Sequence, residues 1–436
     1  MATVMFGGGV LKPGGLYEGW GIRIEGNRIT RIAPNEALKA GVDDIAIDAR
    51  DHIIAPGFIN GHMHMYGVLS HGITAEALVT EFGSFLEDFW WPYVENRIDH
   101  PLARLTAEWA CVEQIDSGIT SFVDVLEAPL SLPGALNAEA EVVRKAGLRA
   151  WLTFEACERV SAENAQAGLK ENAAFVQANN HSDSLVQGMM SVHTLFTGSP
   201  AFLTQAKALA NSIGADIHMH LSESVLEPDW AKAHCGRTPV EVYDELGFLD
   251  ERVLASQCVQ VAPAELAVLK KRGVRAVHMP LSNCEVGGGI APVPDMLTLG
   301  IPVGLGTDGY INNFFEVMRA AFLIHKAYRQ SPQEMPAKSV YEMATSLGAA
   351  AIGRKDTGRL EEGCLADLIT IAMDTPTPIN RHNVYDQLIL FRNPQNVRDV
   401  MVNGVFLKRN GQFTTLNQAR IKAQLRERAA AFWKGK

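Results

Sequence analysis

Two histidines separated by one residue are the clearest chemical feature of the sequence. His62 and His64 stand in the stretch GHMH, residues 61–64, directly after an apolar run. Residues two apart on a β-strand point to the same side, so both imidazoles would enter one cavity if that run forms a strand. The pair alone is a weak signal in a chain with 13 histidines. It gains weight when further ligands converge on it.

Two other stretches supply such ligands. The stretch HMHLSE, residues 218–223, ends another apolar run with a second histidine pair and places Glu223 just beyond it. The stretch GTDG, residues 306–309, ends a third run and contains Asp308. Three imidazoles and one carboxylate satisfy a divalent cation and leave a position open for water, which is typical of a catalytic site. Glu223 is suited to proton transfer beside such a cation.

Eight short apolar runs must position these groups, and we interpret them as buried strands. They are residues 53–59, 119–125, 148–155, 185–192, 215–221, 253–259, 274–279 and 301–305. Helix-like segments lie between them, at residues 103–116, 138–146, 162–178, 201–213, 240–246, 264–272 and 315–328. This alternation predicts an α/β fold with a parallel sheet. Eight units favour a closed (β/α)8 TIM barrel, in which catalytic groups lie at the carboxyl ends of the strands.

The two ends of the chain follow a different pattern, with short strand-like pieces rich in Gly and Asn. These pieces are residues 19–33, 366–373 and 397–413. They predict a small composite β-sandwich domain made of residues 1–55 and 359–436, beside a metal-dependent barrel of residues 56–358. The charged stretch 419–436 is expected to form a packing helix.

Composition and charge exclude several classes of protein. The 436 residues are 47% hydrophobic and carry a formal net charge of -10, which argues against a nucleic-acid partner. The six cysteines are scattered without a CxxC pair, so neither a thiolate zinc site nor a disulfide framework is indicated. The chain also lacks a signal-peptide pattern and any apolar run of about 18 residues. We therefore expect a cytoplasmic protein without a membrane partner.

The stretches described above resemble the amidohydrolase superfamily, in particular the group of triazine hydrolases and methylthioadenosine/S-adenosylhomocysteine deaminases. The similarity extends over nearly the whole chain. Matching segments are residues 55–64 (APGFINGHMH), 117–124 (SGITSFVD), 220–223 (HLSE), 280–283 (PLSN), 289–294 (GIAPVP), 305–309 (LGTDG) and 363–368 (GCLADL). The last of these resembles the point where the family's chain re-enters its β domain, so the resemblance also implies the composite domain.

The resemblance implies roles for five residues. His62, His64, His220 and Asp308 would be the ligands of one divalent cation, with Asp308 also accepting a proton from the bound water. Glu223 would be the proton shuttle. Zn²⁺ is the default for three imidazoles and one carboxylate, and Fe²⁺ or Mn²⁺ would accept the same set. No lysine at a strand end is placed to bridge a second cation, so one metal ion is expected.

The chain departs from its relatives at the end of the sixth strand. Relatives usually carry A-H-C-V-H there, whereas this chain reads SQCVQ at residues 256–260. Gln257 can donate and accept hydrogen bonds but cannot take up a proton near neutral pH. We place Gln257 among the substrate-binding residues, together with His193, where relatives have a substrate-contacting histidine. We also include His278 in this group, mainly as a residue that holds the substrate-contacting side chains in place from outside the cavity.

The aromatic segment after the first strand allows two interpretations. Its members are Phe82, Phe85, Phe89, Trp90, Trp91 and Tyr93. They could form part of a lid over a flat ligand, or they could pack a long loop onto the barrel.

The predicted function is that of a mononuclear, deaminase-like amidohydrolase, in which a metal-bound hydroxide attacks the C–N carbon of an amidine or aminated heterocycle. Purine, pterin, triazine and anthranilate-like substrates remain open. Because Gln257 replaces the usual histidine, a metal-assisted condensation or ring closure is the alternative. A non-catalytic scaffold is disfavoured because all four expected ligands are present. The expected partners are a small flat nitrogen compound and, by resemblance, further copies of the chain in a homodimer or higher homo-oligomer.

Overall fold

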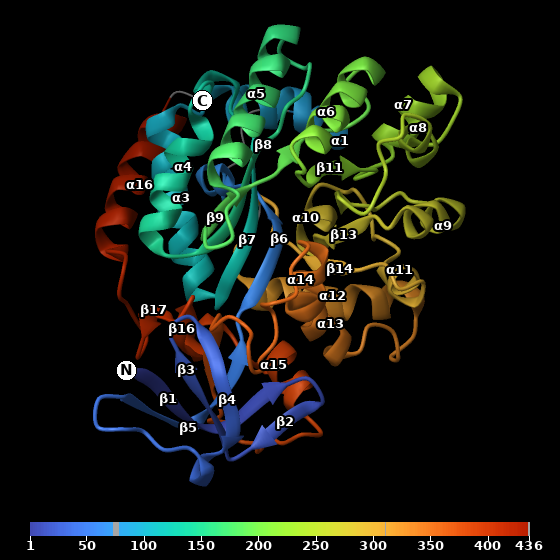
Figure 1. The fold of residues 1–436 in the computed structure, drawn as a ribbon. Coiled ribbons are helices and arrows are strands. Elements are labelled where there is room, and N and C mark those ends of the chain that lie inside the picture. Colours follow the sequence, from blue (N-terminus) through green and yellow to red (C-terminus); the bar gives the residue numbers. More distant parts are fainter. Residues whose placement is uncertain (73–77, 310, 435–436) are drawn as a thin grey trace.

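The computed structural model describes residues 1–72, 78–309 and 311–434, which build two nine-stranded sheets (Figure 1). The larger unit contains a sheet in which every pairing is parallel, in the order β10-β11-β12-β13-β14-β6-β7-β8-β9. Its strands are β6 (Phe58–Met63), β7 (Ile119–Leu126), β8 (Arg149–Phe154), β9 (Val186–Gly188), β10 (Met190–Ser191), β11 (Ile217–Leu221), β12 (Val253–Gln257), β13 (Arg275–His278) and β14 (Val303–Leu305). This parallel sheet confirms the predicted α/β class.

Helices follow most of these strands and cover the sheet (Figure 1). They are α3 (His100–Asp116), α4 (Ala135–Ala146), α5 (Ala162–Asn179), α6 (Pro200–Ser212), α7 (Leu226–Cys235), α8 (Pro239–Glu245), α9 (Pro263–Arg272), α10 (Pro280–Glu285), α11 (Val293–Thr298), α12 (Phe314–Arg329), α13 (Ala337–Ala344) and α14 (Ser346–Ala351). Covered on both faces, β7 and β8 are buried at every residue. This burial explains why the strands read as continuous apolar runs in the sequence.

The two outermost segments of this sheet are consecutive in the chain. β9 pairs with β8, β10 pairs with β11, and only Met189 separates them. An isolated parallel bridge between Ala156 and Val192 continues the contact between the β8 and β10 sides. The predicted run 185–192 therefore contacts both of its neighbours.

The predicted first strand, residues 53–59, is wrong in extent. Residues 53–56 end β5 (Ile45–Pro56), which belongs to the other sheet, and β6 begins only at Phe58. Gly57 lies between them, and a Cβ there would come 2.1 Å from the Thr120 side chain. Residues 52–59 are all buried, so the apolar run continues across the junction and hides it.

Both ends of the chain build the second sheet, which lies in the lower part of Figure 1. Its strands pair in the order β18-β17-β16-β15-β5-β1-β3-β4, and β2 pairs with β1. They are β1 (Ala2–Lys12), β2 (Gly15–Glu18), β3 (Trp20–Glu25), β4 (Arg28–Pro34), β5 (Ile45–Pro56), β15 (Leu368–Ala372), β16 (Val397–Val402), β17 (Val405–Arg409) and β18 (Gln412–Phe413). The strands from the beginning of the chain join those from its end through the antiparallel pairing of β5 with β15.

The last helix returns to the parallel-sheet unit. α15 (Val384–Phe391) contacts α12 and α13, whereas α16 (Gln418–Trp433) packs along α3 (Figure 1). Trp433 Nε1 donates a hydrogen bond of 2.8 Å to the carbonyl oxygen of Leu69, in the turn η2 (Met65–Leu69) that follows β6. The stretch expected to pack as a helix does so as far as Trp433, and residues 435 and 436 lie outside the part of the chain that the structure describes.

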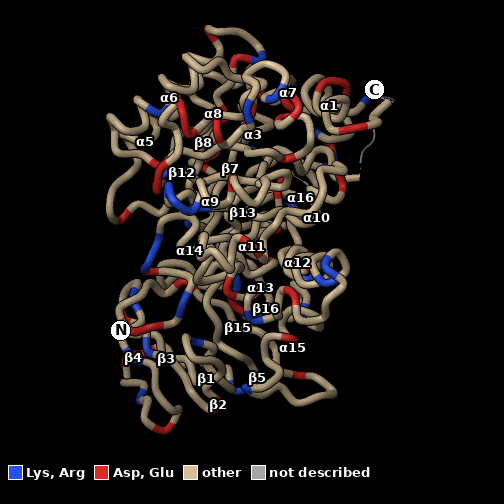
Figure 2. The backbone as a smooth tube through the Cα atoms, turned by 90° about the vertical axis from the view of Figure 1, so that its right-hand side faces the viewer, with Lys and Arg blue, Asp and Glu red and all other residues tan. Residues whose placement is uncertain are grey.

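Charged residues of both signs are interspersed along the chain (Figure 2). Among the described residues, no helix is both long and apolar enough to cross a membrane.

Candidate active site

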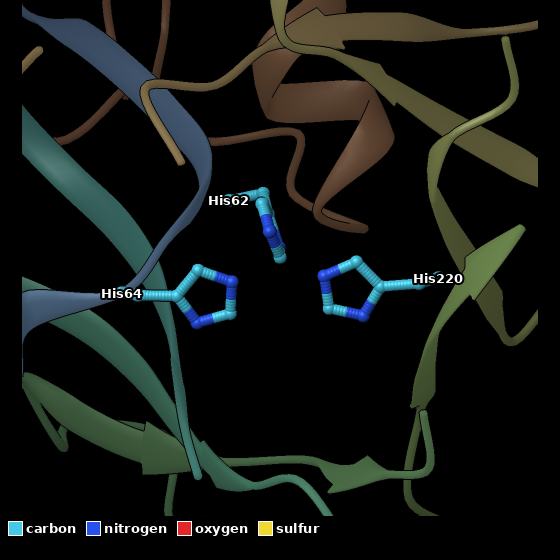
Figure 3. A group of neighbouring side chains, drawn as sticks. All are labelled: His62, His64 and His220. Atoms are coloured by element: carbon cyan, nitrogen blue, oxygen red, sulfur yellow. The ribbon is translucent and has the colours of Figure 1, made fainter. Parts of the chain in front are cut away.

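Three histidines and one aspartate meet at the carboxyl ends of β6, β11 and β14. One ring nitrogen each from His62, His64 and His220 lies within 4.8 Å of the other two. The three rings point toward a common centre (Figure 3). Asp308 Oδ1 lies 3.5 Å from His62 Nε2 and 3.1 Å from His64 Nε2. The structure thus brings together all four residues that were predicted as metal ligands.

The backbone places Asp308 against the first histidine. The amide nitrogens of Thr307 and Asp308 both donate to the carbonyl oxygen of His62, at 3.0 and 3.1 Å. Asp308 has a φ of 58°, in the left-handed region that non-glycine residues rarely adopt. Gln257, at the end of β12, has a φ of 71°. Such strained backbone is often concentrated at functional sites.

The histidine cluster fits a divalent cation. His62 is fully buried, and neither of its ring nitrogens has a hydrogen-bond partner among the described residues. Leaving buried polar atoms unpaired costs free energy, which a bound cation would offset. His64 Nδ1 lies 2.6 Å from the carbonyl oxygen of Val125, so the hydrogen bond leaves Nε2 of His64 for a ligand bond.

When no cation is bound, burial and the Asp308 carboxylate give the three histidines different protonation states. Burial lowers the pKa of His62 to about 4 and that of His220 to about 3. Burial acts in the same direction on His64, but its hydrogen bond and charge interaction with Asp308 prevail and raise that pKa to about 10. Two imidazoles are therefore already in the neutral, metal-binding form at neutral pH, and a cation would replace the proton on the third.

Three donors hold the Asp308 carboxylate. Gln257 Nε2 and Ser282 Oγ each donate to Oδ2 at 2.8 Å, and the amide of Gly309 donates to Oδ1 at 3.0 Å. Asn283 in turn donates to Gln257 Oε1. Gln257 is buried and is not among the residues that line the cavity. Its side chain therefore orients Asp308, and a contact with substrate remains a prediction.

Glu223 lines the same cavity, two residues after the end of β11. Burial and the neighbouring charge of Asp308 raise its pKa well above the ordinary glutamate value. A carboxyl group that keeps its proton near neutral pH can act as a general acid. This is the property that the predicted proton shuttle requires.

The cavity over the histidine cluster has a volume of about 220 Å³. Four members of the aromatic segment line it, namely Phe82, Phe85, Phe89 and Trp90. Phe82 begins the short segment α1 (Phe82–Ser84), and the other three belong to η3 (Phe85–Trp90), which α2 (Trp91–Tyr93) follows. The aromatic segment is thus a wall of the cavity, which favours the first of the two interpretations.

The other two predicted substrate-binding residues lie in different places. His193 lines the cavity, and its Nδ1 lies 3.1 Å from Thr197 Oγ1. His278 is buried outside the lining, where its Nε2 lies 3.2 Å from His325 Nε2. His278 therefore packs behind the site, as expected for a supporting residue.

Sequence reasoning missed a group of acidic residues and one arginine. Glu95, Glu127 and Glu155 line the cavity, and Arg159 bonds to Glu95 at 3.0 Å and to Glu127 at 2.9 Å. Burial, opposed by the histidine charges, raises the pKa of Glu155 to about 7. Glu127 and Glu155 directly follow β7 and β8, so the strand-end rule applied to Asp308 could have found them.

Comparisons with known proteins agree with this architecture. The profile of the amidohydrolase family matches residues 53–407. The chain is 33% identical over 411 residues to the 5'-deoxyadenosine deaminase of Methanosarcina acetivorans, covering 93% of this chain and 92% of that protein. It is also 33% identical over 392 residues to the 5-methylthioadenosine/S-adenosylhomocysteine deaminase of Thermococcus sibiricus, covering 88% of each.

Solved structures share the fold at lower sequence identity. A zinc-bound adenosine deaminase from Xanthomonas campestris matches with a TM-score of 0.88 at 22% identity, covering 98% of both chains. The zinc complex of atrazine chlorohydrolase TrzN from Arthrobacter aurescens TC1 matches with a TM-score of 0.86 at 21% identity, covering 98% of this chain and 100% of that one. The predicted resemblance is confirmed, and the chain belongs to the amidohydrolase family.

Proposed function

We propose that this protein is a mononuclear metal-dependent hydrolase that removes an amino group from the amidine carbon of a small aminated heterocycle. The observation that carries the proposal is the convergence of His62, His64, His220 and Asp308 beneath a cavity with an aromatic wall. In support, the two relatives that are 33% identical to this chain are named as deaminases of 5'-deoxyadenosine and of methylthioadenosine or S-adenosylhomocysteine.

The four convergent side chains would hold one cation, for which zinc is the first candidate and iron(II) or manganese the others. A divalent cation bound there supplies a Lewis acid that polarises the substrate and lowers the pKa of water. Two of its imidazoles need no deprotonation at neutral pH, because burial already keeps them neutral. Gln257 and Ser282 hold Asp308 in the orientation that faces His62 and His64.

Two carboxyl groups would move the protons. Asp308, whose pKa is held well below the ordinary value by His62 and His64 despite its burial, is the base that accepts a proton from the attacking water. Glu223, whose pKa is raised, is the acid that protonates a ring nitrogen; it then takes up the proton of the hydroxyl group newly bound to carbon and delivers it to the departing amine. The proton that Asp308 accepted from water restores Glu223 at the end of the cycle. An amine is a poor leaving group until it is protonated, so this second transfer permits C–N cleavage. His193 would contact the substrate from the end of the β10 side.

The proposal includes the architecture that carries the site. β9 and β10 would together count as one strand, which closes the parallel sheet into a (β/α)8 barrel of residues 56–358. Residues 1–55 and 359–436 would form the composite β domain, with α16 reaching back to the barrel. We further propose a homodimer or higher homo-oligomer in the cytoplasm, and all six cysteines are free, as a reducing compartment requires.

The experiment measures bound metal and ammonia release on the same preparation. The substrates are 5'-deoxyadenosine, methylthioadenosine, an amino-substituted pterin and an amino-substituted triazine. We expect one divalent ion per chain and one ammonia per substrate consumed. A fully metal-loaded protein that converts a substrate without releasing ammonia would instead support a condensation or ring closure.

A further inference from the structure

Acidic side chains are the most numerous polar side chains among the described residues that line the cavity. Six of the described lining residues are acidic, and none is a lysine or an arginine. They are Glu95, Glu127, Glu155, Glu223, Glu285 and Asp308. Behind them, Arg159 is shared between Glu95 and Glu127. Arg159 already engages Glu95 and Glu127, and the described lining supplies no lysine or arginine to the remaining carboxyl groups, so those that are ionised favour a positively charged ligand.

Glu155 is the carboxylate that most clearly lacks a partner. It is 2% exposed, and its Oε1 makes no hydrogen bond within the described part of the chain. That oxygen lies 3.1 Å from His220 Nδ1 and 3.5 Å from His193 Nε2, without the geometry of a hydrogen bond to either ring. A buried carboxylate oxygen left in this state is expensive unless a ligand supplies a donor.

Glu127 stands beside Glu155 at the same end of the sheet. The parallel register pairs Leu126 with Phe154, and the two glutamates are the next residues along β7 and β8. Neighbouring strands lie about 4.8 Å apart, so two carboxylates on adjacent strand ends suit a planar group with several N–H donors. Amidinium and guanidinium groups have this shape.

The aromatic wall adds to the preference for a cation. Trp90 and Phe85 line the cavity, with their ring centroids 5.6 Å apart and their planes inclined by 26°. The faces of such rings attract positive charge. The ring of Trp91 already contacts a cation, the guanidinium of Arg159, whose Cζ lies 4.6 Å from the ring centroid.

We propose that the substrate carries, apart from the carbon that is attacked, a positively charged amidinium, guanidinium or ammonium group that the carboxylates of Glu127 and Glu155 bind. This inference rests on the proposed function and narrows its substrate class. It sets this chain apart from enzymes whose cavities select neutral heterocycles. The reacting carbon would lie over the histidine cluster while the cationic group faces the ends of β7 and β8.

The test uses two flat probes of nearly the same shape, benzamidinium and neutral benzamide. Their affinities for the metal-loaded protein are measured by isothermal titration calorimetry. We expect benzamidinium to bind at least about tenfold more tightly, since a hydrogen bond between charged groups is stronger than one between neutral groups. Equal affinities for the two probes in the unaltered protein would overturn the proposal without any variant.

Glu155→Gln keeps the shape of the side chain and removes its charge. We expect the preference for benzamidinium to fall to about twofold or less, because the unpartnered carboxylate is gone. Glu251→Gln, an exposed carboxylate outside the cavity lining, is the matched control and should keep the full preference. An unchanged preference in Glu155→Gln overturns the proposal.

Metal analysis of the same samples distinguishes an organic cation from a second metal ion. Glu155, His193 and His220 could also hold a divalent ion, since their ligand atoms lie within 4.8 Å of one another. Two metal ions per chain, falling to one in Glu155→Gln, would overturn the proposal. A protein that prefers benzamidinium but releases no ammonia from any substrate would instead contradict the proposed function and still support this inference.

Discussion

Gln257 donates a hydrogen bond of 2.8 Å from its Nε2 to Oδ2 of Asp308. Asn283 donates to the other end of the same amide, so Gln257 links Asn283 to the carboxylate beside the histidine cluster. A glutamine suits this position because it can accept from one neighbour and donate to the next at once. The residue that departs from the family pattern therefore supports the candidate metal site.

Removing this link should weaken the site. We expect Gln257→Leu to lower cation affinity or turnover by about 10- to 100-fold, as is typical when a partner of a metal ligand is lost. Competition with a chelating dye measures the affinity, and steady-state kinetics measures turnover. Gln205→Leu, at an exposed position on α6, serves as the control. Wild-type affinity and turnover in Gln257→Leu would contradict this role.

Gln257→His separates deamination from other chemistry. The imidazole can still donate to Asp308, so we expect the variant to keep its bound cation. It also introduces a group that can take up a proton near neutral pH. Ammonia release is then compared between wild type and variant with aminopurines and aminopterins. Release by the variant alone would show that the unaltered site performs a different reaction.

Glu223→Gln tests the proton transfer. The amide has the same shape but cannot give up a proton, so turnover should fall by about 10²- to 10⁴-fold while the metal content is unchanged. The exposed Glu251→Gln should retain wild-type turnover. If Glu223→Gln binds metal and turns over at the wild-type rate, the assignment of Glu223 is wrong.

Metal removal should destabilise the protein. A ligand that binds only the folded state adds about 4 kcal/mol of stability at a free concentration 1,000 times its Kd. We therefore expect a chelator to lower the melting temperature and added Zn²⁺ to restore it. In His220→Asn the Zn²⁺ response should be much smaller, whereas the exposed His181→Asn should respond like wild type. Identical responses in both variants would place the cation elsewhere.

A buried pair of carboxyl groups predicts how stability depends on pH. Asp124 on β7 and Glu139 on α4 are both fully buried, and Asp124 Oδ1 accepts a hydrogen bond of 2.7 Å from the amide of Met65, next to His64. Burial raises the pKa of Asp124 to about 7 and that of Glu139 well above its ordinary value. Between about pH 4 and these raised pKa values, the folded state holds more protons than the unfolded state.

The free energy of unfolding should therefore fall as the pH rises from 6 to 9, by up to about 1.4 kcal/mol per pH unit for each proton that the pair retains. In Glu139→Gln the side-chain amide can donate a hydrogen bond to Asp124 without binding an additional proton, so the decline in stability with pH should be shallower. Urea denaturation of the metal-free protein at both pH values measures it. Glu141→Gln, exposed on the same helix, should decline like wild type. A Glu139→Gln protein with the wild-type decline would show that the pair holds no extra proton.

The strands of the parallel sheet were predicted well because all of their residues are buried except Gln187 of β9, which is half-buried. The same property concealed the junction at Gly57, where one apolar run contains the end of β5 and the start of β6. Periodicity reports burial but does not tell which sheet buries a residue. The pairing of β5 with β1 and β15 depends on contacts between distant parts of the chain.

Strand-end reasoning found the four convergent residues but could not give side-chain directions beyond the strands. Gln257 adopts a left-handed conformation, and its side chain consequently reaches Asp308 instead of the cavity. Glu127 and Glu155 directly follow their strands, and Asp308 lies three residues beyond β14, yet no metal-ligand spacing singled out the two glutamates. Their importance depends on Arg159 and on the histidines that surround them, which only the fold brings together.

The position of α16 has a practical consequence for protein production. Trp433 stacks on Phe89 with ring centroids 6.4 Å apart, and Phe89 belongs to the cavity wall. A truncation or fusion that displaces Trp433 would thus disturb the wall of the candidate active site, although hundreds of residues separate the two in the chain. Tags at the other end, beside β1, would leave that region undisturbed.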